Sequence, residues 1–145
     1  MTQPLTSAHA EQIIKSAFKK ADELNLAPLT VVIVDTGGHM KALHRADGAT
    51  FFRPQIAFGK AWGAIAMGLD SRTLFSMGEA RPMFMNALIN LSEQRLVPVP
   101  GGVLIKNSDG DMLGAVGVSG DTSDNDEICA VAGVEAAGLI AEYGK

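Results

Sequence analysis

The first third of the chain changes from a helical to a strand-like spacing of hydrophobic residues. From Ser7 to about Leu26, apolar positions recur every three or four residues, which predicts an amphipathic helix. Thr30–Val34 is a continuous β-branched run, typical of a strand that is covered on both faces. Because two glycines at 37–38 supply a tight turn, His39–Arg45 is predicted to return as the second strand of a hairpin.

The middle of the chain is predicted to be helical. Pro54 suits the first turn of a helix, and large apolar residues recur from there to Leu69. Two shorter helices are predicted, one capped by Ser71 and ending near Met77, and one over Met83–Leu91. The two prolines within 97–100 exclude a central strand there, since each removes a backbone donor. That segment is expected to be an irregular edge.

A second hairpin is predicted near the C-terminus. Its strands are Val103–Lys106 and Met112–Val118, and the turn between them is Ser-Asp-Gly at 108–110. The second strand contains Gly114 and Gly117, and glycine inside a strand often marks a place where another group comes close.

The last predicted helix follows a polar loop at 119–122. Ser123 and Asp126 have the spacing of a capping box at its start. The helix is apolar on nearly every side as far as Ile140, and such a helix is usually covered twice. One cover is expected to be its own sheet. The pattern leaves two equal alternatives for the other, a second subunit or the remainder of a monomer.

These elements together predict an α+β fold. The order is helix, β-hairpin, two or three helices, β-hairpin, helix, so the strands form adjacent antiparallel pairs and not βαβ units. We expect a central antiparallel sheet, made of two hairpins plus an irregular edge and flanked by helices. At 145 residues, the chain is expected to be a single domain over residues 1–145.

Composition narrows the classes of partner. The formal net charge is −4, and no basic patch interleaved with aromatic residues indicates a nucleic-acid partner. Cys129 is the only cysteine, so no intramolecular disulfide can form. The N-terminus lacks the features of a signal peptide, and the longest apolar run, about 61–69, is too short to cross a bilayer. We expect a cytoplasmic protein with no membrane partner.

The side chains with obvious chemistry are few. His39 and His44 fall on opposite faces of one predicted strand and cannot jointly hold an ion, while His9 lies in the first helix. Each histidine is therefore either an ordinary polar side chain or a single metal ligand. Cys129 follows several acids in its helix, which predicts an inert thiol.

Cations and glycines suggest one possible ligand site. Arg45, Arg53 and Lys60, with the glycines of the second hairpin, would frame a flat pocket suited to a planar ligand that bears carboxylates. The loop at 117–122 would present backbone amides at a helix start. The plainer interpretation is solvated surface charge beside turn glycines and a capped helix.

Six segments in this order resemble one known family. They are VIVDTGGH at 32–39, RADGA at 45–49, IAFGKA at 56–61, GGV at 101–103, GAVGVSG at 114–120 and DE at 126–127. The chain thus resembles the GlcG/HbpS family of haem-binding proteins, also called the haem-degrading domain or domain of unknown function 336. The same domain forms the C-terminal part of some PduO-type proteins. Two departures from the family pattern, Leu104 and the bulky stretch at 51–54, are expected to reshape a pocket.

The resemblance implies a profilin-like layout, homo-oligomers and haem or a related tetrapyrrole as ligand. It makes His39 the candidate axial ligand of the haem iron, with Arg45 and Lys60 paired to propionates. The candidates for the ligand pocket, all of which match the family pattern, are His39, Arg45, Lys60, Gly101, Gly102, Gly117, Ser119, Asp121 and Thr122.

Two other functions remain open at this stage. One is a small catabolic isomerase, tautomerase or lyase, in which Arg45 or Arg53 binds the carboxylate of an organic acid and His39 or Asp121 moves a proton. The other is a non-catalytic accessory protein of a catabolic operon.

Overall fold

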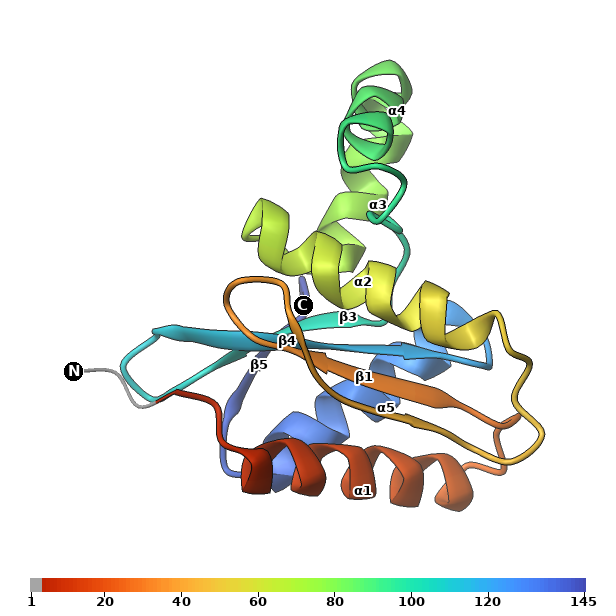
Figure 1. Cartoon of the computed structure of the whole chain (residues 1–145), viewed down its shortest axis with the longest axis vertical. Coiled ribbons are helices and arrows are strands. Elements are labelled where there is room, and N and C mark those ends of the chain that lie inside the picture. The colour runs from red at the N-terminus through yellow and green to blue at the C-terminus, as the bar shows by residue number, and fades with distance from the viewer. Residues whose placement is uncertain (1–3) are drawn as a thin grey trace.

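The computed structural model describes residues 4–145, which form one open sheet with helices on both faces (Figure 1). The elements in chain order are α1 (Ser7–Glu23), β1 (Thr30–Val34), β2 (Met40–Arg45), α2 (Arg53–Met67), α3 (Ser71–Ala80), α4 (Pro82–Leu91), β3 (Gly102–Lys106), β4 (Met112–Ser119), α5 (Ser123–Ala136) and β5 (Ile140–Glu142).

The sheet has the strand order β2-β1-β4-β3-β5, and every neighbouring pair is antiparallel. Both predicted hairpins are confirmed, and the pairing of β1 with β4 joins them into one sheet. The α+β fold is therefore confirmed, and the segment 97–100 is irregular as predicted.

A fifth strand was missed by the sequence prediction, which continued the last helix to Ile140. The helix α5 ends at Ala136, and Gly138 has a φ of 76°, a conformation that glycine adopts without strain and that reverses the chain. Ile140 then begins β5, which pairs with β3 at the edge of the sheet.

The two faces of the sheet carry different cores. Helices α1 and α5 cover one face of the sheet and α2 covers the other (Figure 1). Along β1, Val31 and Ile33 belong to the core cluster on the α1 and α5 face, whereas Val32 and Val34 belong to the cluster beneath α2. Successive strand residues point to opposite faces, so a strand covered on both sides must be apolar throughout. This is the physical reason for the continuous apolar run in β1.

The second cover of α5 is α1 of the same chain. Cys129, Ala130 and Val134 share a buried cluster with Ile13. A Cβ placed at Gly133 would lie 2.5 Å from the carbonyl oxygen of Ile13, so glycine is what allows the two helices to approach. The apolar pattern of α5 is thus satisfied within one copy and does not itself require a second subunit.

The start of α5 differs from the predicted capping box. Thr122 is the N-cap, and its hydroxyl oxygen accepts from the Asn125 N–H at 3.2 Å. Asp126 is buried and turned toward α2, so the predicted pairing of Ser123 with Asp126 was wrong. The burial of a carboxylate requires a partner, and α2 supplies it.

Helix α2 lies directly on the sheet because two strand residues there are glycines. A Cβ at Gly117 would overlap the carbonyl oxygen of Ala57, and a Cβ at Gly102 would overlap that of Lys60. The glycine-rich character of β4 therefore reflects close packing of a helix backbone against a strand.

Helices α3 and α4 form an arm, residues 71–91, that projects from the sheet (Figure 1). Asp70, and not Ser71, caps α3, since its Oδ1 accepts from the Thr73 N–H at 2.9 Å. Arg72 anchors the arm to α5: its Nε donates to Glu127 at 2.9 Å, and its guanidinium also pairs with Asp124. None of the helices within residues 4–145 combines the length and hydrophobicity needed to cross a membrane.

The contact of Gly117 with α2 generates a stability prediction. We expect Gly117→Ala to lower the free energy of unfolding by about 1–3 kcal/mol, the usual range for overpacking, because its Cβ meets rigid backbone. Gly78→Ala is the matched control, since a Cβ there lies 3.3 Å from the flexible Met85 side chain and alanine favours the helix. Urea denaturation measures both. Equal stability of Gly117→Ala and the wild type would contradict this account of the packing.

Candidate ligand-binding site

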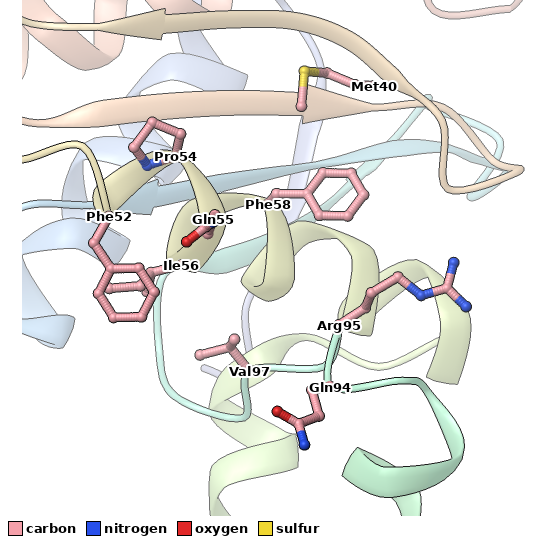
Figure 2. A pocket seen from close by; sticks show the side chains of 9 residues that line it. All are labelled: Met40, Phe52, Pro54, Gln55, Ile56, Phe58, Gln94, Arg95 and Val97. Atoms are coloured by element: carbon pink, nitrogen blue, oxygen red, sulfur yellow. The ribbon is translucent and has the colours of Figure 1, made fainter.

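A pocket of about 530 Å³ lies between the N-terminal half of α2 and the chain segment that follows α4 (Figure 2). Its walls are mainly apolar, with amide side chains and one guanidinium among them. The lining residues are Met40, Phe52, Pro54, Gln55, Ile56, Phe58, Gln94, Arg95 and Val97.

The outer wall of the pocket is held against α2 by two glycines of that helix. The Val97 N–H donates to the carbonyl oxygen of Gly59 at 3.2 Å. A Cβ at Gly59 would lie 2.8 Å from the carbonyl oxygen of Arg95, and a Cβ at Gly63 would lie 3.0 Å from Leu96. The small residues of α2 thus position the segment 95–97.

The chain enters this wall through a tight reversal after α4. Glu93 and Gln94 have φ values of 56° and 64°, which non-glycine residues seldom adopt. The Gln94 N–H donates to the carbonyl oxygen of Ile89 at 2.9 Å, which closes the end of the helix. Such conformations persist only where the surrounding contacts hold them, so the backbone at this end of the pocket wall is fixed.

Arg95 places a positive charge at the rim of the pocket. Its guanidinium carbon lies 4.3 Å from the centroid of the Trp62 ring, and its Nε donates to the carbonyl oxygen of Ser92 at 2.9 Å. The cation is therefore oriented from two sides. Its two terminal nitrogens are left for a ligand, and a planar guanidinium is well suited to a carboxylate.

The turn that precedes β2 adjoins this rim. A Cβ at Gly38 would lie 3.0 Å from Nε1 of Trp62, so the turn packs on the same indole as Arg95. Asp35 Oδ1 accepts from the N–H groups of Gly37 and His39, at 2.9 and 3.0 Å. The hydrogen bond from the His39 backbone is the main cause that lowers the pKa of Asp35.

His39 itself projects from the turn, and its side chain is 82 % exposed. Nδ1 lies 3.4 Å from Oδ1 of Asp35, which orients the imidazole and leaves Nε2 accessible. A carboxylate behind one ring nitrogen is the usual support for a histidine that binds a metal through the other nitrogen.

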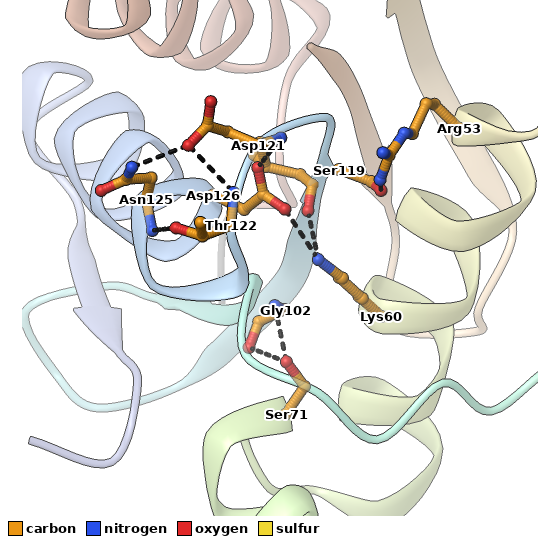
Figure 3. Close-up of polar contacts among 10 residues, drawn as sticks. Arg53, Lys60, Ser71, Gly102, Ser119, Asp121, Thr122, Asn125 and Asp126 are labelled. Atoms are coloured by element: carbon orange, nitrogen blue, oxygen red, sulfur yellow. Dashed lines mark hydrogen bonds and ion pairs between the residues drawn. The ribbon is translucent and has the colours of Figure 1, made fainter. Parts of the chain in front are cut away.

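Lys60 lies inside the protein and not at a pocket rim, contrary to our expectation of a propionate partner. Its side chain is only 2 % exposed. Nζ donates to the Val118 carbonyl oxygen at 2.9 Å and to Asp126 Oδ2 at 3.1 Å (Figure 3). Burial lowers the pKa of Lys60 and raises that of Asp126, and the attraction between the two groups opposes both shifts.

Several of the other predicted site residues form the junction around this pair (Figure 3). A Cβ at Gly101 would lie 2.8 Å from Lys60 Nζ, so the glycine makes room for the ammonium. Ser119 Oγ accepts from Arg53 at 3.1 Å, and Thr122 caps α5.

Asp121 completes the junction. Its carboxylate accepts from the side chain of Asn125 at 2.7 Å and from the N–H groups of Ala27 and Thr122. The hydrogen bond from Asn125 is the main cause that lowers the pKa of Asp121. The polar side chains of the loop 119–122 therefore form hydrogen bonds within the protein.

The remaining cation and histidine lie apart from the pocket. Arg45 is exposed at the far end of β2 from His39, about 20 Å away at 3.3 Å per strand residue. His44 packs edge-on against Phe18 of α1, with ring centroids 4.8 Å apart. The structure therefore does not gather His39, Arg45 and Lys60 around one ligand.

The sequence analysis missed Arg95 and Trp62, the two residues that shape the charged rim. Arg95 follows α4 in a segment where hydrophobic residues show neither helical nor strand spacing. From the sequence alone, a cation in such a segment is interpreted as an ordinary surface charge. The available signal was the spacing of Gly59 and Gly63, four residues apart on one face of α2, which indicates a close contact.

Comparison with known proteins identifies relatives along nearly the whole chain. The family model described as haem-degrading protein HbpS-like matches residues 5–135. A 15.0 kDa protein in the dhaT-dhaS intergenic region of Citrobacter freundii is 28 % identical over 126 residues, which cover 87 % of each chain.

Two solved structures share the fold closely. The Klebsiella pneumoniae protein ORFY, assigned to DUF336, has a TM-score of 0.85 and 29 % identity, covering 95 % of this chain and 93 % of its own. The crystal structure of a PduOC–haem complex also has a TM-score of 0.85, with 25 % identity, covering 94 % of this chain and 97 % of its own.

The buried pair of Lys60 and Asp126 generates a second stability prediction. We expect Lys60→Met to lower the free energy of unfolding by about 3–5 kcal/mol, because Asp126 is left as an uncompensated buried charge. Urea denaturation of Lys60→Met, Asp126→Asn and the double variant provides the measurement and its control. The double variant should lose less than the sum of the single variants, and strict additivity would contradict a direct coupling.

Proposed function

We propose that this chain binds haem or a closely related tetrapyrrole, a proposal that starts from its family: the chain belongs to the haem-degrading HbpS-like proteins. The observation that carries the proposal is the apolar pocket with Arg95 at its rim, in a fold shared with the PduOC–haem complex. A homo-oligomeric state and a cytoplasmic location stay predictions.

The pocket suits the apolar body and the acidic edge of such a ligand. A volume of about 530 Å³ falls within the usual range of small-molecule sites, and Phe52, Ile56 and Phe58 supply the apolar wall (Figure 2). Arg95 would pair with a propionate. This assigns to Arg95 the role that the sequence analysis gave to Arg45 and Lys60.

The donor atoms available within residues 4–145 also suit a haem better than a bare metal ion. No group of three or more histidine, cysteine, aspartate or glutamate side chains in that part of the chain could hold a metal. A haem iron needs only one or two protein ligands. Met40 lines the pocket and would bring a thioether to it. His39, the residue before it, lies in the neighbouring hollow with Asp35 and Lys41, and would supply Nε2 to a ligand that extends beyond the rim.

The pocket favours binding over acid–base catalysis of an organic acid. Arg95 is the only ionisable residue among those that line it, and a guanidinium does not exchange protons near neutral pH. Arg53 is engaged by Ser119, and Asp121 by backbone N–H groups. The iron of a bound haem would supply any redox chemistry, while the protein residues bind and orient the ligand.

Haem titration tests the role of His39. We expect wild-type protein to shift the Soret band on adding haem and His39→Ala to lose that shift, because the iron then lacks its protein nitrogen. His9→Ala and His44→Ala are the matched controls and should keep the shift. An unchanged haem spectrum on adding the wild-type protein would contradict haem binding. Loss of the Soret shift in only one of the control variants would identify that histidine, and not His39, as the iron ligand.

A second titration tests Arg95. We expect Arg95→Gln to raise the dissociation constant for haem about tenfold, equivalent to about 1.4 kcal/mol, because one propionate loses its charged partner. Arg45→Gln serves as the control and should bind like the wild type, since its side chain lies at the other end of β2. A larger effect of Arg45→Gln than of Arg95→Gln would place the propionates elsewhere.

A further inference from the structure

The outer face of α4 is an apolar surface that the chain itself does not cover. The helix contains no ionisable residue. On its inner side, Met85 is buried against Leu74 and Leu96. On its outer side, Met83 and Leu91 are 86 and 80 % exposed. A helix that is apolar on both sides is normally buried on both.

A second exposed apolar surface lies at the start of α2. Phe51 is 85 % exposed and Phe52 is 58 % exposed, and Phe52 forms part of the pocket wall. Met40, across the pocket on β2, is also exposed. This surface is concave, because the pocket opens within it.

The two surfaces cannot meet within one copy. The segment that returns from the arm, residues 92–97, forms a wall of the pocket, so the pocket lies in the corner between the arm and α2. The exposed face of α4 lies on the opposite side of the helix from Met85, whose side chain packs on Leu96 of this returning segment. Arg72 holds the base of the arm to α5, so the arm is fixed in its projecting position.

We propose that the outer face of α4 in a second copy of this chain covers the pocket mouth together with Phe51 and Phe52, and that the contact is reciprocal. The second copy's Met83 and Leu91 then complete the apolar wall of the ligand site. The role of these residues in holding haem rests on the proposed function above, whereas the contact between copies does not.

The exposed area is of the size that a stable dimer requires. At about 200 Å² for each fully exposed large side chain, the exposed fractions of the following residues leave about 800 Å² of apolar surface per copy, which equals the roughly 800 Å² per partner in a standard interface. They are Met40, Phe51, Phe52, Met83, Phe84 and Leu91.

Charge also favours a second copy over a charged partner. The helix α4 itself has no ionisable residue, and Arg95 is the only one that lines the pocket, so the contact surfaces carry little charge. The nearest other charge is Arg81 at the start of α4, which stacks on Phe84 with its guanidinium carbon 4.5 Å from the ring centroid. Each copy carries both the exposed α4 face and the pocket mouth, so a twofold arrangement lets each copy provide one surface of each kind and closes the contact at two copies.

Disulfide trapping tests the contact directly on haem-free protein. Two chains are prepared, one with Met83→Cys and one with Phe51→Cys, then mixed and oxidised with oxidised glutathione. The native Cys129 is buried and its pKa is raised to about 12, so it contributes little background. We expect a mixed disulfide dimer in the mixture. Disulfides that join only like variants, or no dimer at all, would overturn the proposal.

Mass in solution and haem affinity provide the second readout. We expect Leu91→Glu, an exposed substitution that spares the fold, to lower the native mass and to weaken haem binding at least fivefold. Leu24→Glu, on an exposed apolar residue of similar size at the end of α1, is the control and should change neither. An unchanged native mass of Leu91→Glu overturns the contact. If the wild type binds no haem, the proposed function fails, and the trapping result still decides the contact.

Discussion

The close approach of α2 to the sheet is the constraint on which the rest of the structure depends. It exists because Gly117 and Gly102 have no side chain where the helix backbone passes. On its other side, α2 repeats the device with Gly59 and Gly63, against which the outer pocket wall packs. The position of α2 therefore determines both the core beneath it and the ligand site beside it. Glycines at the contacts let the backbones pack directly against each other, which leaves no space for either neighbour to shift.

The same approach decides which charges serve the fold and which remain for a ligand. Since α2 lies so close to β4, the Lys60 side chain has nowhere to go but the interior, where Asp126 and the Val118 carbonyl oxygen compensate its charge. Arg95 lies on the opposite side of the helix and keeps its terminal nitrogens outward, with Trp62 beneath it. His39 is held by Asp35 at the surface. The buried charges of Lys60 and Asp126 compensate each other within the fold, whereas Arg95 and His39 remain at the surface, where a ligand can reach them.

Local sequence determined most of the secondary structure. The two hairpins followed from β-branched runs on either side of glycine turns, and α1 followed from its spacing of apolar residues, because both depend on a few neighbouring positions. The errors have the same local origin. The short β5 was absorbed into α5, since three residues carry too little periodicity. The N-cap of α5 was misplaced by one residue, because Thr122 and Ser123 have equivalent hydroxyls.

By itself, then, the sequence determined the α+β class, the antiparallel pairing, the family resemblance and His39 as a candidate ligand in an exposed turn. Only the tertiary structure decided that Lys60, Gly101, Gly102, Gly117 and Ser119 belong to an interior junction. It likewise decided that Arg95, stacked on Trp62, lines a pocket together with Phe52. The physical reason is that burial is a property of contacts between distant segments. The sequence alone does not show whether the ammonium of a lysine is hydrated at the surface or paired with a buried carboxylate. For Lys60, the position of α2 on the sheet decides that it is buried and paired with Asp126.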